Sequence, residues 1–174
     1  MKKASLILLV SCSTLLYSQI RYSGKIEPNL NINIGRTLTV DPTPYWQGYD
    51  LDHKQNGSGI NFINGVMFRE KFFAGLGVGY QNFYHADASP KNIHGAAFFF
   101  NGEYVNLEKP RSILFYTNLG LSTIWKNSGT HATSAVEIGT GYNSQFMKDH
   151  IYIKGGIGLM HHHAFLKFGA GYRF

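Results

Sequence analysis

The chain ends with the stretch HHHAFLKFGAGYRF, residues 161–174, in which apolar side chains recur at every second position. Leu166, Phe168, Ala170, Tyr172 and Phe174 share one parity, whereas the positions between them hold lysine, glycine and arginine. Successive side chains of a β-strand point to opposite faces, so this spacing predicts a strand with one apolar and one small or charged face. A helix would mix the two sets around its circumference.

The same alternation recurs along the chain, with turn-like segments between the repeats. It predicts further strands at about 25–39, 59–68, 72–84, 93–105, 112–125, 133–144 and 150–160. Most exceed the roughly 5–6 residues of a typical soluble strand and reach the roughly 9–11 residues that a tilted strand needs to cross a bilayer. Only a closed barrel can take strands through lipid, because every edge amide needs a partner. The sequence therefore predicts an all-β fold, an eight-stranded antiparallel up-and-down transmembrane β-barrel.

Composition agrees with a single membrane-embedded domain. The 174 residues include 20 glycines and 15% aromatic residues, but only 15% charged residues. An average soluble chain carries about 25% charged residues. The net charge of +6 is scattered and no nucleic-acid-binding motif is present, so a nucleic-acid partner is not expected.

The first residues, MKKASLILLVSCSTLLYSQ, predict a cleaved export signal over 1–19, followed by the barrel domain over 20–174. Two lysines precede an apolar run that is too short to span a bilayer as a helix. Processing as a lipoprotein at Cys12 is the alternative, because small and aliphatic residues precede this cysteine. In either case the chain has a single cysteine and therefore no internal disulfide.

Parity also predicts which face of each strand points where. In a transmembrane barrel the apolar set faces lipid, and glycine, asparagine and the few charges face the lumen. The charges assigned to the lumen are Arg69, Glu103, Glu137, Lys154, Lys167 and Arg173. The many lumenal glycines either leave a water-filled cavity or admit the rings of Phe73, Phe99, Tyr116 and Tyr152. With the two faces exchanged, the chain would be a soluble lipocalin-like carrier of an apolar ligand, which is the alternative fold.

The export signal, the eight alternating strands and the terminal FGAGYRF together resemble the small outer-membrane β-barrels of Gram-negative bacteria, of the OmpA-like and OmpX-like type. The resemblance covers essentially the whole chain after the signal. It implies a location in the bacterial outer membrane, in contact with membrane lipid and lipopolysaccharide. It also implies that the barrel-assembly machinery reads Phe168, Tyr172 and Phe174 in the last strand. It implies no particular activity, because one barrel architecture carries many functions.

Histidines gather at the predicted outer rim and suggest a metal site there. Neutral imidazoles bind transition metals, and His131, His161 and His163 are the candidate ligands. Consecutive strand residues point to opposite faces, so the triplet 161–163 can converge only if it forms a turn. A rim site for a metal or haem is therefore an alternative function, and no cofactor is expected otherwise.

The segment THATSAVEIG, residues 130–139, raises the question of a lipid A-modifying enzyme. A histidine base has to meet a hydroxyl and be oriented by an acid. His131 and Ser134 differ in parity, and Thr133 stands where small-barrel lipid A deacylases carry a serine. Lipid A modification stays an alternative, but the prediction is that this protein has no catalytic activity.

The longest predicted connection is the loop 40–58, which contains Tyr45, Trp46 and Tyr49. Loops on a rigid scaffold vary freely and often carry function, so this loop is the candidate contact surface for an extracellular partner. Taken together, the residues predict an outer-membrane barrel with a structural or surface-interaction role.

Overall fold

The computed structural model describes residues 20–37, 51, 54–84, 92–126 and 129–174. The predicted signal and most of the loop 40–58 lie outside these residues. The described chain forms eight strands: β1 (Ile20–Arg36), β2 (Gly57–Phe68), β3 (Phe72–Phe83), β4 (Ile93–Val105), β5 (Arg111–Lys126), β6 (Gly129–Phe146), β7 (Asp149–Met160) and β8 (His163–Arg173). Within this part of the chain, no helix is long and apolar enough to cross a membrane.

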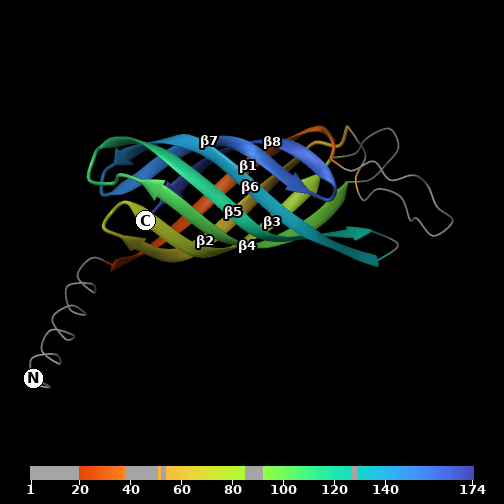
Figure 1. Cartoon of the computed structure of the whole chain (residues 1–174), viewed down its shortest axis with the longest axis horizontal. Helices are drawn as coiled ribbons and strands as arrows, with labels where there is room; N and C mark the ends of the chain where they lie inside the picture. Colours follow the sequence, from red (N-terminus) through yellow and green to blue (C-terminus); the bar gives the residue numbers. More distant parts are fainter. Residues whose placement is uncertain (1–19, 38–50, 52–53, 85–91, 127–128) are drawn as a thin grey trace, which may run out of the picture.

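The strands close into a barrel in sequence order, and each strand pairs with its neighbours in an antiparallel manner (Figure 1). Closure occurs between β1 and β8, where Lys25 lies opposite Arg173 and Leu30 lies opposite Phe168. Closure removes the sheet edges that would leave backbone amides unpaired. The predicted all-β, eight-stranded, up-and-down barrel is confirmed.

The two ends of the barrel differ. The first strand begins, the last strand ends, and the connections β2–β3, β4–β5 and β6–β7 all lie at one end, which we call the terminal end (Figure 1). The other connections lie at the opposite end, the loop end. Two connections contain a turn whose two central residues both have positive φ. These residues are Arg69 and Glu70 (54° and 52°) in the three-residue connection between Phe68 and Phe72, and His161 and His162 (50° and 61°) in the two-residue connection between Met160 and His163. Positive φ at both central residues is the requirement of a type I′ hairpin turn.

The apolar parity faces outward along every strand. Large apolar side chains with about half of their surface exposed include Leu30, Leu76, Val78, Phe98, Phe115, Leu121, Ile138, Ile153, Ile157 and Phe168. Most glycines, asparagines and charged residues of the strands face the interior. The lipocalin-like alternative is therefore wrong, because that fold would bury the apolar parity inside the barrel.

Strand β6 is longer than its alternation predicted, because it begins at Gly129 rather than near Thr133. Its first residues pair with β5, with Thr130 opposite Trp125, although this stretch of small polar residues has no apolar alternation. Pairing with β7 begins only at Val136, opposite Leu159. The paired ends of β5 and β6 consequently extend past the β7–β8 turn as a ribbon (Figure 1).

Candidate functional site

The interior of the barrel is the place where the polar residues gather, and apolar clusters close it at both ends. At the terminal end a buried cluster consists of Ile63, Met67, Phe73, Phe99, Val105, Leu107, Leu114, Tyr116 and Tyr152. At the loop end a second cluster consists of Leu51, Phe83, Ile93, Ile124, Met160 and Phe165. Charged and amide side chains fill the space between and around the two clusters.

Glu27 and Glu103 organise most of the buried charge. Lys154 Nζ lies 2.6 Å from Glu27 Oε2, and Tyr152 donates a hydrogen bond to the other oxygen of the same carboxylate. Lys25 Nζ lies 2.9 Å from Glu103 Oε2 and 3.7 Å from Glu27, so it links the two carboxylates. Arg173 forms an ion pair with Glu103. Buried charges are tolerated when they are paired and hydrogen-bonded in this way.

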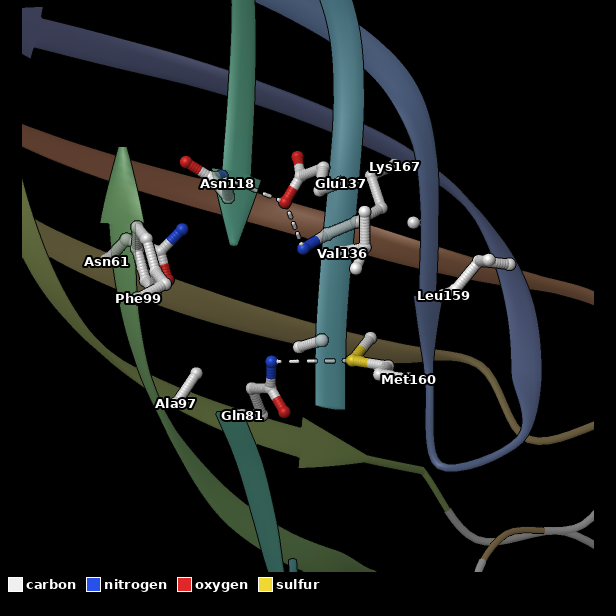
Figure 2. Close-up of a pocket in the computed structure, with 12 residues that line it drawn as sticks. Asn61, Gln81, Ala97, Phe99, Asn118, Val136, Glu137, Leu159, Met160 and Lys167 are labelled. Atoms are coloured by element: carbon white, nitrogen blue, oxygen red, sulfur yellow. Dashed lines mark hydrogen bonds and ion pairs between the residues drawn. The ribbon is translucent and has the colours of Figure 1, made fainter. Parts of the chain in front are cut away.

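Glu137 forms a second, smaller centre. Lys167 Nζ donates to Glu137 Oε2 at 2.7 Å, and Asn118 Nδ2 donates to the same oxygen at 3.1 Å. Tyr116 donates to Oε1 at 2.8 Å. Figure 2 shows the Asn118 and Lys167 contacts converging on this carboxylate. With three donors on one carboxylate, Glu137 acts as a stable anion in a structural network.

A small cavity of about 30 Å³ lies beside Glu137, between the charge network and the loop-end cluster. Its walls include Asn61, Gln81, Asn118, Lys167 and Met160, and Figure 2 shows Gln81 directed at the Met160 sulfur. A cavity needs roughly 10–15 Å³ to hold one water molecule, so this space suits about two waters. It does not suit an organic substrate.

Glycines line the lumen because aromatic rings press against them. The Tyr152 ring lies where a Cβ on Gly171 would be. A Cβ on Gly139 would come within 2.7 Å of the Tyr116 ring and even closer to the Gly155 carbonyl oxygen. A Cβ on Gly77 would come within 2.5 Å of the Phe99 ring. Of the two explanations for the lumenal glycines, the structure shows the second, in which they admit rings rather than leave a wide cavity.

His161 is fully buried at the loop end, where it contacts the hydroxyl groups of Ser122 and Thr133. Ser122 donates its hydroxyl proton to Gln81 Oε1 at 2.8 Å. Its contact of 2.9 Å with His161 Nε2 therefore has the imidazole as donor. The other ring nitrogen of His161 lies 3.2 Å from the Thr133 hydroxyl. A serine that donates to an amide rather than to histidine is not an activated nucleophile.

The structure does not gather His131, His161 and His163 into a metal site. His163 Nδ1 is 3.0 Å from the Asn33 amide nitrogen, and both ring nitrogens of His161 contact hydroxyls. Among the residues that the structure describes, no group of three His, Cys, Asp or Glu side chains could hold a metal ion. His161 forms a turn with His162, as convergence would require, but its ring points into the hydroxyl network.

The segment 130–139 holds no catalytic triad. The Ser134 side chain lies on the exposed face of β6, whereas Glu137 is buried in the lumen and bonded to Lys167. His131 is half-buried and is of the lumenal parity. Ser134 therefore lies on the opposite face of the barrel wall from His131 and Glu137.

Five of the six charges assigned to the lumen by parity lie inside it: Glu103, Glu137, Lys154, Lys167 and Arg173. The assignment of Arg69 is wrong. Strand β2 ends at Phe68, and Arg69 is an exposed residue in the positive-φ turn, where strand parity no longer applies.

Sequence reasoning missed Lys25 and Glu27, which are both fully buried. A signal for them was present, because they share parity with Asn29, Asn31 and Asn33 on the polar face of the same strand. Extending the alternation of the asparagines toward the start of β1 would have placed both charged side chains on the lumenal face.

Comparison with known proteins adds evidence on the fold. No protein-family model matches the chain, and a search of curated proteins finds no significant match. Among solved structures, Neisserial surface protein A is similar with a TM-score of 0.59 at 9% identity, over 88% of this chain and 97% of that one. The N-terminal β-barrel domain of Pseudomonas aeruginosa OprF is similar with a TM-score of 0.51 at 15% identity, over 90% of this chain and 100% of that domain. The chain has the fold of the small eight-stranded outer-membrane β-barrels.

Proposed function

We propose that this protein resides in the bacterial outer membrane and has a structural or surface-interaction role without catalytic activity. The observation that carries the proposal is the sealed, charge-paired lumen inside a wall whose outer face is apolar. Such a barrel offers lipid a compatible surface, but it offers solutes no passage and substrates no reaction centre.

The apolar outer face supports the membrane location. Monomeric soluble proteins rarely expose a continuous apolar surface larger than a few hundred Å². Here exposed leucine, isoleucine, valine and phenylalanine side chains occur on all eight strands. The strands have 11 to 18 residues, which is enough to cross a hydrocarbon core. The neighbouring lipids would then be those of the outer membrane, including lipopolysaccharide in its outer leaflet.

The lumen supports a non-catalytic role. Its carboxylates are held by lysine, arginine, tyrosine and asparagine side chains, and its loop-end serine donates to an amide. None of the groups described above combines a nucleophile with a base that an acid orients. Leu51 in the first loop packs into the cluster that closes the loop end, which further separates the lumen from solvent.

The ribbon formed by the ends of β5 and β6 supports a surface-interaction role. In the described part of the chain, residues 129–135 of β6 pair only with β5. An unpaired strand edge is a template on which an extended segment of another protein can add a strand. Trp125, which is half-exposed on the same ribbon, offers an aromatic contact beside this edge. Together with the loop 40–58, the ribbon is the proposed contact surface for an extracellular partner.

The last strand supports recognition by the barrel-assembly machinery. The side chains of Phe168, Tyr172 and Phe174 are 50%, 39% and 48% exposed, and all lie on the outer face. They share one parity at the end of the segment that pairs with β1 to close the barrel, and all three are accessible from the lipid side.

The location is tested by fractionating cells and comparing boiled with unboiled samples of the membrane fraction on a gel. A compact, faster-migrating band that is lost on boiling is expected. Protease added to intact cells should cleave at the loop end and leave the barrel intact. A soluble protein without a mobility shift would refute the membrane location.

The surface role is tested by site-specific photo-crosslinking in living cells. A photoreactive residue at Ala132, on the ribbon, should yield protein adducts. The same residue at Ala170, on the lipid-facing side of β8, is the matched control and should yield lipid adducts alone. If Ala132 gives no more protein adducts than Ala170, the ribbon is not an interaction surface.

A further inference from the structure

Charge inside the barrel is not balanced. Among the described residues, four buried cations (Lys25, Lys154, Lys167 and Arg173) face three buried carboxylates (Glu27, Glu103 and Glu137). Lys167 and Glu137 form a pair of their own at 2.7 Å. The positive charge in excess therefore lies in the remaining group, where Glu27 and Glu103 are shared by three cations.

Arg173 is the cation whose hydrogen-bonding capacity is least used. Its side chain is 1% exposed, and one terminal nitrogen pairs with Glu103. Its Nε and its other terminal nitrogen are buried and have no hydrogen-bond partner in the protein. Its guanidinium carbon lies 5.7 Å from the Phe73 ring centroid and 5.5 Å from that of Tyr152, so aromatic rings flank it. An arginine stays charged when buried, and its unmet donors are costly there.

A second buried donor lies at the same level of the lumen. The Ser23 hydroxyl is fully buried and has no partner within the protein. Ser23 belongs to the lumenal parity of β1, two residues before Lys25, which lies opposite Arg173 across the closing seam. On its other side Ser23 lies opposite Gly65, which has no side chain to offer.

Other unpartnered groups at this end differ in kind. Ser112 and Asn143 lie opposite each other on β5 and β6, and they present a hydroxyl and an amide oxygen. This hydroxyl can donate to an acceptor on the neighbouring strand. Arg173 instead presents only unmet donors, and the Ser23 hydroxyl, which can donate or accept, lies near this uncompensated positive charge with no acceptor of its own.

From these observations we infer that the terminal end of the lumen binds one small inorganic anion of the halide class, held by Arg173 and the Ser23 hydroxyl. Such an anion balances the excess charge and accepts hydrogen bonds from both side chains. The apolar cluster around Phe73 and Leu114 shields the site from water, which strengthens an ionic contact. This site is independent of the proposed surface role, because it lies inside the barrel at the end opposite the ribbon.

Bromide is the probe, because its anomalous scattering identifies it in a crystal. Crystals of the full barrel grown in sodium bromide should show one anomalous peak within hydrogen-bond distance of Arg173 Nε or of its free terminal nitrogen. A crystal without an anomalous peak at Arg173 would refute the inference and would indicate that water satisfies these donors.

Unfolding in matched salts provides the solution test. A ligand that binds only the native state lowers the unfolding equilibrium constant about 100-fold when its concentration is about 100 times its Kd. Bromide and chloride should therefore stabilise the barrel relative to gluconate, a much larger anion, at equal ionic strength. Identical unfolding curves in bromide and gluconate would contradict the inference.

Variants separate the site from general salt effects. Ser23→Ala should reduce the difference between bromide and gluconate, and Arg173→Gln should abolish it. Ser122→Ala is the matched control, because Ser122 is equally buried but is already bonded to Gln81 and His161 at the loop end. If Arg173→Gln does not assemble, Ser23→Ala and the wild-type anomalous map decide the question.

Discussion

Gly24 and Phe174 close the barrel by direct contact. Gly24 N donates to Phe174 O at 3.0 Å, and Phe174 N donates to Gly24 O at 3.1 Å. The Phe174 ring lies over Gly24, so that a Cβ at this glycine would come within 2.5 Å of ring atoms Cε2 and Cζ. The last residue of the chain is thus both a hydrogen-bond partner and a lipid-facing cover for the first strand.

We expect Gly24→Ala to destabilise the barrel by about 1 kcal/mol, because the added methyl group displaces the Phe174 ring from the seam. Urea unfolding in detergent, followed by the heat-sensitive gel shift, measures the change. Gly102→Ala is the matched control: a Cβ there meets other atoms only at 3.5 Å, so its effect should stay within about 0.5 kcal/mol. Equal effects of the two substitutions would show that the ring contact is unimportant.

Glu103 forms ion pairs with two buried cations, Lys25 and Arg173. Removing one member of a buried pair leaves an uncompensated charge, so Glu103→Gln should cost about 3–5 kcal/mol in the free energy of unfolding. Glu70→Gln is the control, because Glu70 pairs with Arg21 on the surface at 3.0 Å. Surface pairs contribute about 0–1 kcal/mol.

A double substitution examines the same pair further. Lys25→Met combined with Glu103→Gln should cost less than the sum of the two single changes, because the double variant removes both charges. Strict additivity would mean that the two side chains do not interact.

The cost of placing a charged side chain on the lipid-facing surface should depend on its depth in the bilayer. Ile153 is 64% exposed and lies at the middle of β7. In a lipid bilayer, Ile153→Lys should lower the free energy of unfolding by about 2–4 kcal/mol. Phe146→Lys, at the end of β6 beside its turn, should cost about 0–1 kcal/mol. Refolding titrations in lipid vesicles measure both changes. Equal costs at both depths would argue against a transmembrane orientation.

His161 should contribute to stability through its buried hydrogen bonds. His161→Ala leaves Ser122 and Thr133 without their imidazole partner and should cost about 1–3 kcal/mol. His162→Ala is the control, because it occupies the same turn with a similar positive φ of 61° but is exposed. The difference in unfolding free energy between the two variants measures the contribution of the His161 hydrogen bonds, because the effect of the turn backbone is common to both.

The sealed lumen should not conduct. Liposomes that contain the barrel should not swell in isotonic solutions of small sugars, because apolar clusters that include Leu51 and Leu107 close the two ends. Barrels of roughly 16–18 strands leave an aqueous channel and provide the positive control. Swelling at a comparable rate would show that the interior opens.

Much of the fold could be predicted because strand parity is a local property. The alternation of Leu30, Ile32 and Ile34 with asparagines is visible in the sequence and states which side chains share a face. The same rule failed at Arg69, where a positive-φ turn ends the strand. The rule also missed the first residues of β6, because their small polar side chains do not alternate with apolar ones. Pairing with β5 keeps this stretch in a strand.

The candidate site could be predicted only in part. Parity indicated that Glu103, Lys154 and Arg173 face inward, but it did not indicate their partners. His161 illustrates the same limit, since its hydroxyl partners lie on β5 and β6, 39 and 28 residues away in the chain.

By itself, then, the sequence determined the strands, their lipid-facing side and the closed barrel, because backbone alternation and the need to pair every amide follow from local geometry. Only the tertiary structure decided which charges meet. Glu103 receives Lys25 from 78 residues away and Arg173 from 70 residues away. The tilt of the strands and their register across the β1–β8 seam determine which of these charges meet. The alternation of side chains does not specify the register, because shifting one strand by two residues leaves the same side chains on the same face.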